Sequence, residues 1–216
     1  MVNKYLRELL SSSDLEVIHN SIKKLEWVDA ALDTTKVCDT AVNTGDDYGL
    51  IDKMVFDNLS LDNELTYITQ PKSTTNTRVN RMNVGGKYDL HIDSPHLGHY
   101  STTTFLSDPS TYDGGELVLH IDGENLAIKP EAGWAITYLT GIPHTVKPVT
   151  RGTRLVCVNW TVSEFSNPVL RDFSSDIHRC KDLATVMGHS GKFEDDLSSP
   201  VHILSELHFK VMRLVL

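Results

Sequence analysis

The sequence has no long apolar run and few cysteines. No stretch approaches the roughly 20 apolar residues of a membrane-spanning helix, so we expect no membrane partner. The first ten residues carry charges and no apolar core, which argues against a signal peptide. Cys38, Cys157 and Cys180 are odd in number and widely spaced, which matches neither a disulfide framework nor a zinc knuckle. We therefore expect a reducing, intracellular and cytoplasmic setting.

Positive charge is also scarce. The chain has 20 Lys and Arg against 29 Asp and Glu, a formal net charge of −9. A general nucleic-acid or anionic-membrane footprint needs clustered basic residues, so this balance disfavours both kinds of partner. The 216 residues, 40% of them hydrophobic, suffice for one domain with a buried core.

The hydrophobic period changes along the chain. Helical spacing predicts helices over 14–27, with Ser13 as N-cap, over 47–57 and 62–69, and near the end over 200–215. From residue 78 onward, short β-branched and aromatic runs alternate with turn signals, which indicates an all-β sandwich or barrel. The predicted strands are 79–84, 88–92, 101–106, 116–121, 126–129, 134–139, 144–148 and 153–162. The chain from about 169 is mixed and polar.

One predicted strand carries a cation on an apolar face. Strand alternation puts Arg154 on the same side as Val156, Val158 and Trp160, and puts Leu155 and Cys157 on the other. A charge buried there needs a partner. A structural carboxylate would satisfy it, and so would a bound dicarboxylate held by the guanidinium. Helices from the N-terminal segment are expected to cover the opposite face.

Three residues form a candidate metal site. His91 and Asp93 stand two positions apart and His144 follows much later. Two imidazoles and one carboxylate are what a mononuclear non-haem Fe(II) centre needs, with other coordination positions left open. A His-x-Asp triplet alone is weak, and a single histidine is more often a surface residue than a ligand. The hypothesis depends on the residues around the triplet.

Those surroundings carry a family resemblance. From about residue 80 to 163 the chain resembles the Fe(II)/2-oxoglutarate-dependent dioxygenase superfamily, and within it the prolyl 4-hydroxylase-like branch and the bacterial PKHD-type hydroxylases. Besides the triad, Arg154 and Trp160, the resemblance rests on NRMNVGGKY at 80–88, FLSDP at 105–109, YDGGEL at 112–117 and HTVKPVTRGTR at 144–154.

The resemblance implies a fold, a site and a reaction. The fold is mainly β with flanking helices: a double-stranded β-helix, or jelly roll, over 76–165, with helical support from 1–75 and a C-terminal extension over 166–216, all one domain. His91, Asp93 and His144 would bind Fe(II), and Arg154 would pair with 2-oxoglutarate. O2 is the other co-substrate and ascorbate an optional reductant. Hydroxylation of a peptide or protein substrate, with proline the first guess, would release succinate and CO2.

Other site residues are open at this stage. Tyr88 lines the pocket or packs in the core; Thr103 binds the co-substrate or is an ordinary strand threonine; Trp160 flanks the site or only packs. Relatives often carry tyrosines near the positions of Phe105 and Met82. Neither residue has a hydroxyl, so the sequence leaves open which hydroxyl groups take the place of those tyrosines.

Several features are expected to be structural. We expect His96 and His99 at the surface, Arg151 in a solvated turn, and Asp113-Gly114-Gly115 in a hairpin turn. Alternative functions are the same chemistry on another protein side chain, a free amino acid or a nucleobase, a jelly-roll binding module without catalysis, or a cupin-type enzyme that uses no keto acid. An internal salt bridge to Arg154 would favour the last. The sequence does not reveal the oligomeric state.

Overall fold

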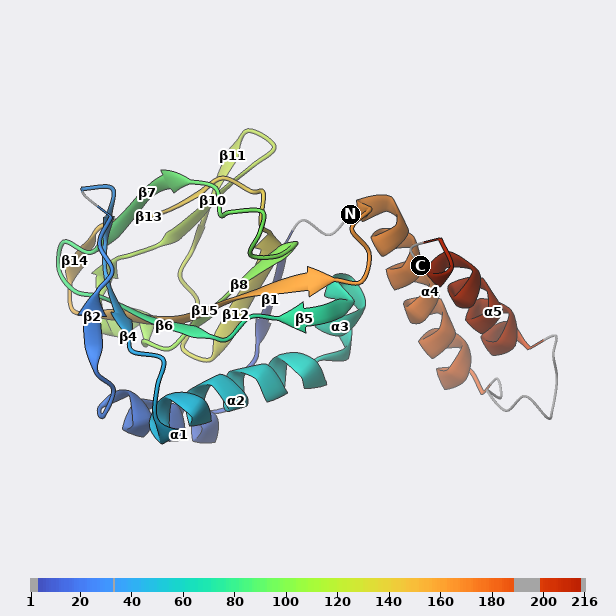
Figure 1. Cartoon of the computed structure of the whole chain (residues 1–216), viewed down its shortest axis with the longest axis horizontal. Helices are drawn as coiled ribbons and strands as arrows, with labels where there is room; N and C mark the ends of the chain where they lie inside the picture. The colour runs from blue at the N-terminus through green and yellow to red at the C-terminus, as the bar shows by residue number, and fades with distance from the viewer. Residues whose placement is uncertain (1–3, 33, 189–198, 215–216) are drawn as a thin grey trace.

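Two antiparallel sheets face each other and enclose the main core (Figure 1). The computed structural model describes residues 4–32, 34–188 and 199–214. The larger sheet has the order β1 (Lys4–Glu8), β12 (Trp134–Leu139), β8 (Tyr100–Phe105), β15 (Arg154–Ser163), β6 (Arg78–Met82), β4 (Asp39–Ala41) and β2 (Trp27–Asp29), with β5 (Pro71–Thr74) paired to β15. The smaller sheet runs β11 (Glu124–Ile128), β10 (Leu117–Ile121), β13 (His144–Val146), β7 (Lys87–His91) and β3 (Lys36–Val37). This is the expected jelly roll.

Side-chain alternation on β15 sorts the residues as predicted. Val156 and Phe105 are register partners in β15 and β8 and belong to the core between the sheets. Cys157 and Leu155 point to the opposite side, where they pack with helical residues. The face that carries Arg154 is therefore the inner face of the barrel.

Helices cover the outer face of the larger sheet, as Figure 1 shows. Buried residues of α1 (Ser12–Ile22) and α2 (Asp46–Leu61), among them Ile18 and Ile51, pack against Cys157. The short helix α3 (Asn63–Thr69) follows α2. Burial of apolar surface on both sides of the sheet fixes the strand that carries Arg154 between two packed layers.

Two details of the first predicted helix are wrong. Its N-cap is Ser11, because the Ser11 hydroxyl accepts from the backbone of Asp14 and the Asp14 carboxylate accepts in return from the backbone of Ser11. It also ends at Ile22, because Trp27 enters β2 and pairs with Ala41. Pairing of β2 with β4 competes with helical spacing here.

All eight predicted strands exist, with ends that differ by a few residues. The predicted hairpin turn at Asp113-Gly114-Gly115 is wrong: Asp113–Gly114 form β9, which pairs with β14 (Val149–Arg151). A Cβ on Gly114 would lie 2.0 Å from the carbonyl oxygen of Pro148, so only glycine allows this pairing. Five short strands within 1–75 were also not predicted, so that segment supports the core with strands as well as helices.

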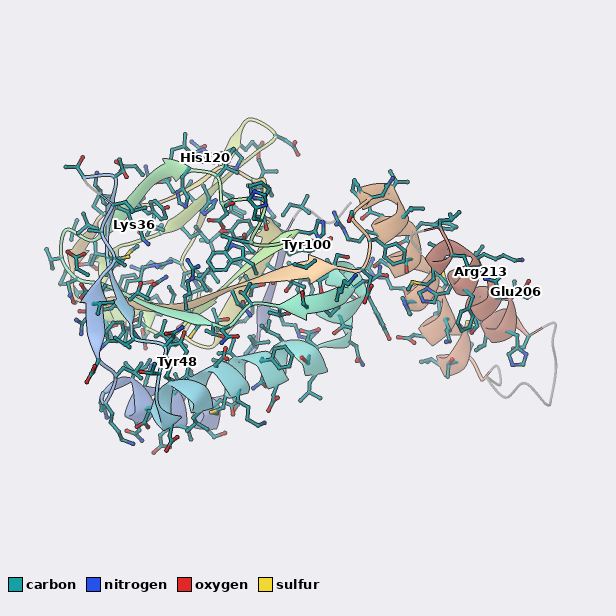
Figure 2. All side chains as sticks on the ribbon, viewed as in Figure 1. Lys36, Tyr48, Tyr100, His120, Glu206 and Arg213 are labelled. Atoms are coloured by element: carbon teal, nitrogen blue, oxygen red, sulfur yellow. The ribbon has the colours of Figure 1, made fainter. Side chains whose placement is uncertain are left out.

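The C-terminal part is a pair of helices beside the barrel (Figure 1). The predicted helix over 200–215 is α5 (Pro200–Met212), and Val215 lies outside the described residues. The longer helix α4 (Pro168–Val186) was not predicted. Figure 2 shows Tyr100 between the barrel and these helices, where the guanidinium of Arg171 lies 5.1 Å from its ring. Of the helices described, none is long and apolar enough to cross a membrane.

Candidate metal centre

Pairing in the smaller sheet brings the two predicted histidine ligands together. His91 is the last residue of β7 and His144 the first of β13, and they are register partners. Asp93 follows β7 in a loop, and its Oδ1 lies 3.8 Å from Nε2 of His91 and 3.9 Å from Nε2 of His144. The three donor atoms lie within 4.8 Å of one another, so one ion can contact all three.

Backbone contacts set the tautomer of both imidazoles. Nδ1 of His91 lies 2.8 Å from the carbonyl oxygen of Asp89, and Nδ1 of His144 lies 3.0 Å from that of Ile142. Because a carbonyl oxygen can only accept, each Nδ1 carries the proton and each Nε2 keeps a lone pair. Burial, and then the nearby His144, lowers the pKa of His91, which favours the neutral form that binds metal.

The other oxygen of the aspartate is held from the opposite sheet. Oδ2 of Asp93 accepts from the Trp160 indole and from the Ser101 hydroxyl, both at 2.9 Å. Ser101 and Trp160 are register partners on the inner face of β8 and β15. Such contacts orient a carboxylate ligand, and here they leave Oδ1 facing the histidines. The predicted site residue Trp160 thus touches a candidate ligand directly.

Arg154 lies on the same inner face, buried and without an ion pair among the described residues. It is 2% exposed, and its Nε has no hydrogen-bond partner. Burial lowers its pKa from the ordinary arginine value, while Tyr112 and Tyr138 oppose that shift. Its guanidinium carbon lies 5.4 Å from the centre of the Phe105 ring. An uncompensated buried cation is costly, and a bound anion would remove that cost.

The tyrosine beside Arg154 was not predicted from the sequence. Tyr138 is 2% exposed and lines the same cavity as Arg154 and Thr103. Burial raises the pKa of its phenol, an effect that a hydrogen bond with Thr103 only partly offsets, so the phenol stays a donor. Phe105, which stands where relatives often carry a tyrosine, offers only its ring. Hydroxyl groups near Arg154 thus come from β8 and β12, and also from Tyr112, the other tyrosine that interacts electrostatically with Arg154.

A cavity of about 570 Å³ joins these groups, a size typical of small-molecule sites. Tyr88 lies in its wall and stacks on His91 with ring centres 3.5 Å apart, so it faces the pocket. Met82 is buried in the same wall, at the position of the second missing tyrosine. Apolar residues such as Leu117 and Val156 also line the cavity, which lowers the local dielectric and strengthens charge interactions.

Other residues singled out in the sequence lie away from this cavity, except Cys38, which is in its lining. His96 is exposed, as expected, but His99 is half-buried and its Nδ1 accepts from the backbone of Ser163, so its surface assignment is wrong. Arg151 is exposed and pairs with Asp113 at 2.6 Å, which agrees with a surface role. Of the cysteines, Cys38 and Cys157 are buried and Cys180 is exposed, all as free thiols.

Known proteins share this core. A family model described as "2OG-Fe(II) oxygenase superfamily" matches residues 77–162. A PKHD-type hydroxylase of Maricaulis maris is 38% identical over 57% of this chain and 57% of its own length, so the alignment spans little more than half of that relative. A PKHD-type hydroxylase of Rippkaea orientalis is 27% identical over 96% of both chains.

A solved structure shares the fold. A prolyl hydroxylase from Trichoplax adhaerens, in complex with a peptide fragment of the hypoxia inducible factor oxygen degradation domain, aligns with a TM-score of 0.60 and 18% identity. The alignment covers 75% of this chain and 84% of that one. At this identity the likeness concerns the jelly roll and not the substrate.

Proposed function

We propose that this chain, a member of the 2OG-Fe(II) oxygenase superfamily, is a hydroxylase that depends on Fe(II) and 2-oxoglutarate. The observation that carries the proposal is the convergence of His91, Asp93 and His144 on one point of a cavity. The same cavity holds a buried arginine, Arg154, that has no ion pair within the described part of the chain. A two-histidine, one-carboxylate site with open positions suits Fe(II). The relatives named PKHD-type hydroxylase support the same activity.

Some residues would bind the metal, and others would orient its carboxylate ligand. Nε2 of His91, Nε2 of His144 and Oδ1 of Asp93 would hold the metal, while Trp160 and Ser101 keep the carboxylate turned toward it. When bound, Fe(II) supplies the redox chemistry that couples O2 and the oxidative decarboxylation of 2-oxoglutarate to insertion of one oxygen atom into a C–H bond. The products would be the alcohol, succinate and CO2.

Arg154 would bind the distal carboxylate of the keto acid. A bidentate contact with carboxylate would satisfy the guanidinium that the described residues leave without an ion pair. Tyr138 and Thr103 would add hydroxyl donors on the same side. An internal ion pair at Arg154 would have favoured a cupin-type enzyme without a keto acid, so its absence from the described residues supports 2-oxoglutarate.

The substrate we propose is a peptide, with proline as the first candidate for the hydroxylated residue. The similar prolyl hydroxylase solved with a peptide supports this choice. The jelly-roll core over 76–165 would carry the chemistry, with 1–75 as its support and 166–216 as a C-terminal extension of the same single domain. Tyr88, stacked on His91, would form the wall that the substrate side chain meets.

The test is succinate formation from 2-oxoglutarate in the presence of Fe(II), O2 and ascorbate, with and without a panel of peptides. We expect slow succinate release without peptide, and faster release with a peptide that gains the mass of one oxygen atom. A protein that binds Fe(II) and forms no succinate with any member of the panel would contradict the proposed activity.

A further inference from the structure

Two cations lie at the mouth of the cavity, in addition to the buried Arg154. Lys36 is in β3, and its Nζ lies 5.4 Å from the ring centre of Tyr88, its register partner in β7. Arg78 is exposed at the start of β6, and its guanidinium carbon lies 4.8 Å from the ring of Trp160. Both residues line the cavity, and Figure 2 shows Lys36 beside β7.

Each cation is one aromatic ring away from a candidate metal ligand. The ring under Lys36 is Tyr88, which stacks on His91, and the ring under Arg78 is Trp160, which donates to Asp93. The two cations belong to different sheets, since β3 is in the smaller sheet and β6 in the larger. Both cations line the cavity that a substrate must enter to reach the metal.

Neither cation has an ion pair among the described residues, although neighbouring cations do. Arg81 pairs with Asp39, and Lys87 pairs with Asp89. The side chain close to Lys36 is the thiol of Cys38, which is neutral because burial raises its pKa. Among the residues that line the cavity, Asp93 is the only acidic one. The chain has more acidic than basic residues, so an unpaired basic pair here is a local exception.

Binding of Fe(II) and 2-oxoglutarate would not neutralise these two cations. The charge of Fe(II) is offset by Asp93 and the keto acid, and the second carboxylate of the keto acid is offset by Arg154. The positive charge that remains at the mouth belongs to Lys36 and Arg78. It favours a substrate that brings its own carboxylates.

We propose that the substrate is an acidic peptide, in which carboxylate side chains flank the hydroxylated residue and contact Lys36 and Arg78. This inference rests on the proposed function and specifies its substrate class. Val28, Ile92 and Leu97 also line the cavity, and the first two are more than half exposed at 51% and 57%, so apolar peptide groups can pack between the charges. Two separated cations on a chain of net charge −9 do not form the basic track that a nucleic-acid backbone needs.

Peptide binding tests the proposal without turnover. The full chain is loaded anaerobically with Fe(II) and 2-oxoglutarate, and fluorescent peptides are titrated by anisotropy. The peptides share one central sequence and differ only in flanking Glu, Ser or Lys residues. We expect the Glu peptide to bind on the order of tenfold more tightly than the Ser peptide, and the Lys peptide more weakly still. Added salt should reduce the difference.

Variants test whether Lys36 and Arg78 cause the preference for the Glu peptide. In Lys36→Gln/Arg78→Gln the Glu and Ser peptides should bind alike, and Arg78→Lys should retain most of the preference. The control Lys23→Gln removes a lysine of the α1 C-cap, whose Nζ contacts Asn20 away from the cavity, and should keep the wild-type preference. Only variants that still load Fe(II) and 2-oxoglutarate are compared. The salt dependence of the wild type provides a second test if the double variant does not load.

Three results would overturn this inference. They are equal binding of the three peptides to the loaded wild type, tighter binding of a single-stranded oligonucleotide than of the Glu peptide, and displacement of the Glu peptide by free glutamate at a similar concentration. Each leaves the proposed hydroxylase intact, because loading is measured first. A chain that binds neither Fe(II) nor 2-oxoglutarate would instead contradict the proposed function.

Discussion

The indole nitrogen of Trp160 lies 2.9 Å from Oδ2 of Asp93, across the barrel from the histidines that face Oδ1 of the same carboxylate. One oxygen of Asp93 is thus fixed by the larger sheet while the other points toward the smaller sheet. The candidate metal centre depends on both sheets at once. A change in the larger sheet, which contributes no histidine ligand, can therefore disturb the geometry of the centre.

Removing the indole donor should weaken metal binding without unfolding the chain. Loss of a hydrogen bond to a ligand typically costs about 10–100-fold in metal affinity, so Trp160→Phe is expected to reduce Fe(II) affinity by that order. Anaerobic titration with Fe(II) measures it. Trp27→Phe is the matched control, because Trp27 lies under Arg81 in β2 and donates to no ligand. Equal affinity of Trp160→Phe and wild type would show that this contact does not orient Asp93.

Arg154→Met should separate stability from co-substrate binding. Replacing an unpaired buried charge by an apolar side chain of similar length should leave the thermal midpoint of the ligand-free protein unchanged or raise it. The same change should raise the KM for 2-oxoglutarate at least about tenfold, because a charge-assisted contact is lost. Arg151→Met, at a surface ion pair, should alter neither quantity much. A lower midpoint with an unchanged KM would assign Arg154 a structural role.

Tyr138→Phe should weaken 2-oxoglutarate binding and leave Fe(II) binding intact. The ring stays in the core, and only the hydroxyl donor near Arg154 is lost. A hydrogen bond to a charged group contributes about 1.5–3 kcal/mol, so a loss on the order of tenfold or more is expected. Tyr100→Phe is the control: its hydroxyl donates to the carbonyl of Ile68, and its loss should affect stability instead. Unchanged 2-oxoglutarate affinity would remove Tyr138 from the binding site.

Tyr138 also shows where sequence reasoning reached its limit. Alternation along β12 assigns Tyr138 to one face, but one sequence does not say that β12 pairs with β8 beside Arg154. The triad was accessible because family motifs preserve its spacing. Likewise β1 to β5 were not predicted, because each is short and all except β2 pair with a strand far away in the sequence. The helix α4 was missed because most of the residues that it buries are polar, namely Arg171, Ser174 and Ser175, so its buried face does not stand out as apolar in the sequence.

The C-terminal helices should loosen in mild acid. His178 of α4 and His208 of α5 lie with ring centres 4.4 Å apart. Burial, followed by His208 and Lys181, lowers the pKa of His178, which Asp182 opposes; burial and then Lys181 lower that of His208. Histidines with a lowered folded pKa stabilise the fold above their ordinary pKa of about 6.5, and this contribution is lost as the pH falls below it.

Hydrogen exchange of the α4 and α5 amides measures this effect locally. Protection is expected to fall between about pH 7.5 and pH 5.5, and to fall less in His208→Gln, which removes one titrating group and its influence on His178. His91 and His99 also have lowered pKa values. Exchange of the barrel amides is therefore measured in parallel, so that the pH effect of these two histidines is compared with that of the helical pair. Protection that is independent of pH in the wild-type helices would contradict this reading of the histidine pair.

The most direct measurement is the absorption spectrum of the anaerobic protein with Fe(II) and 2-oxoglutarate. A keto acid that chelates Fe(II) gives a visible charge-transfer band that neither component shows alone. We expect this band for the wild type and its loss in His144→Ala, in which two protein ligands remain of three. No band in a folded wild-type protein, or an undiminished band in His144→Ala, would contradict the assignment of this cavity as the Fe(II) and 2-oxoglutarate site.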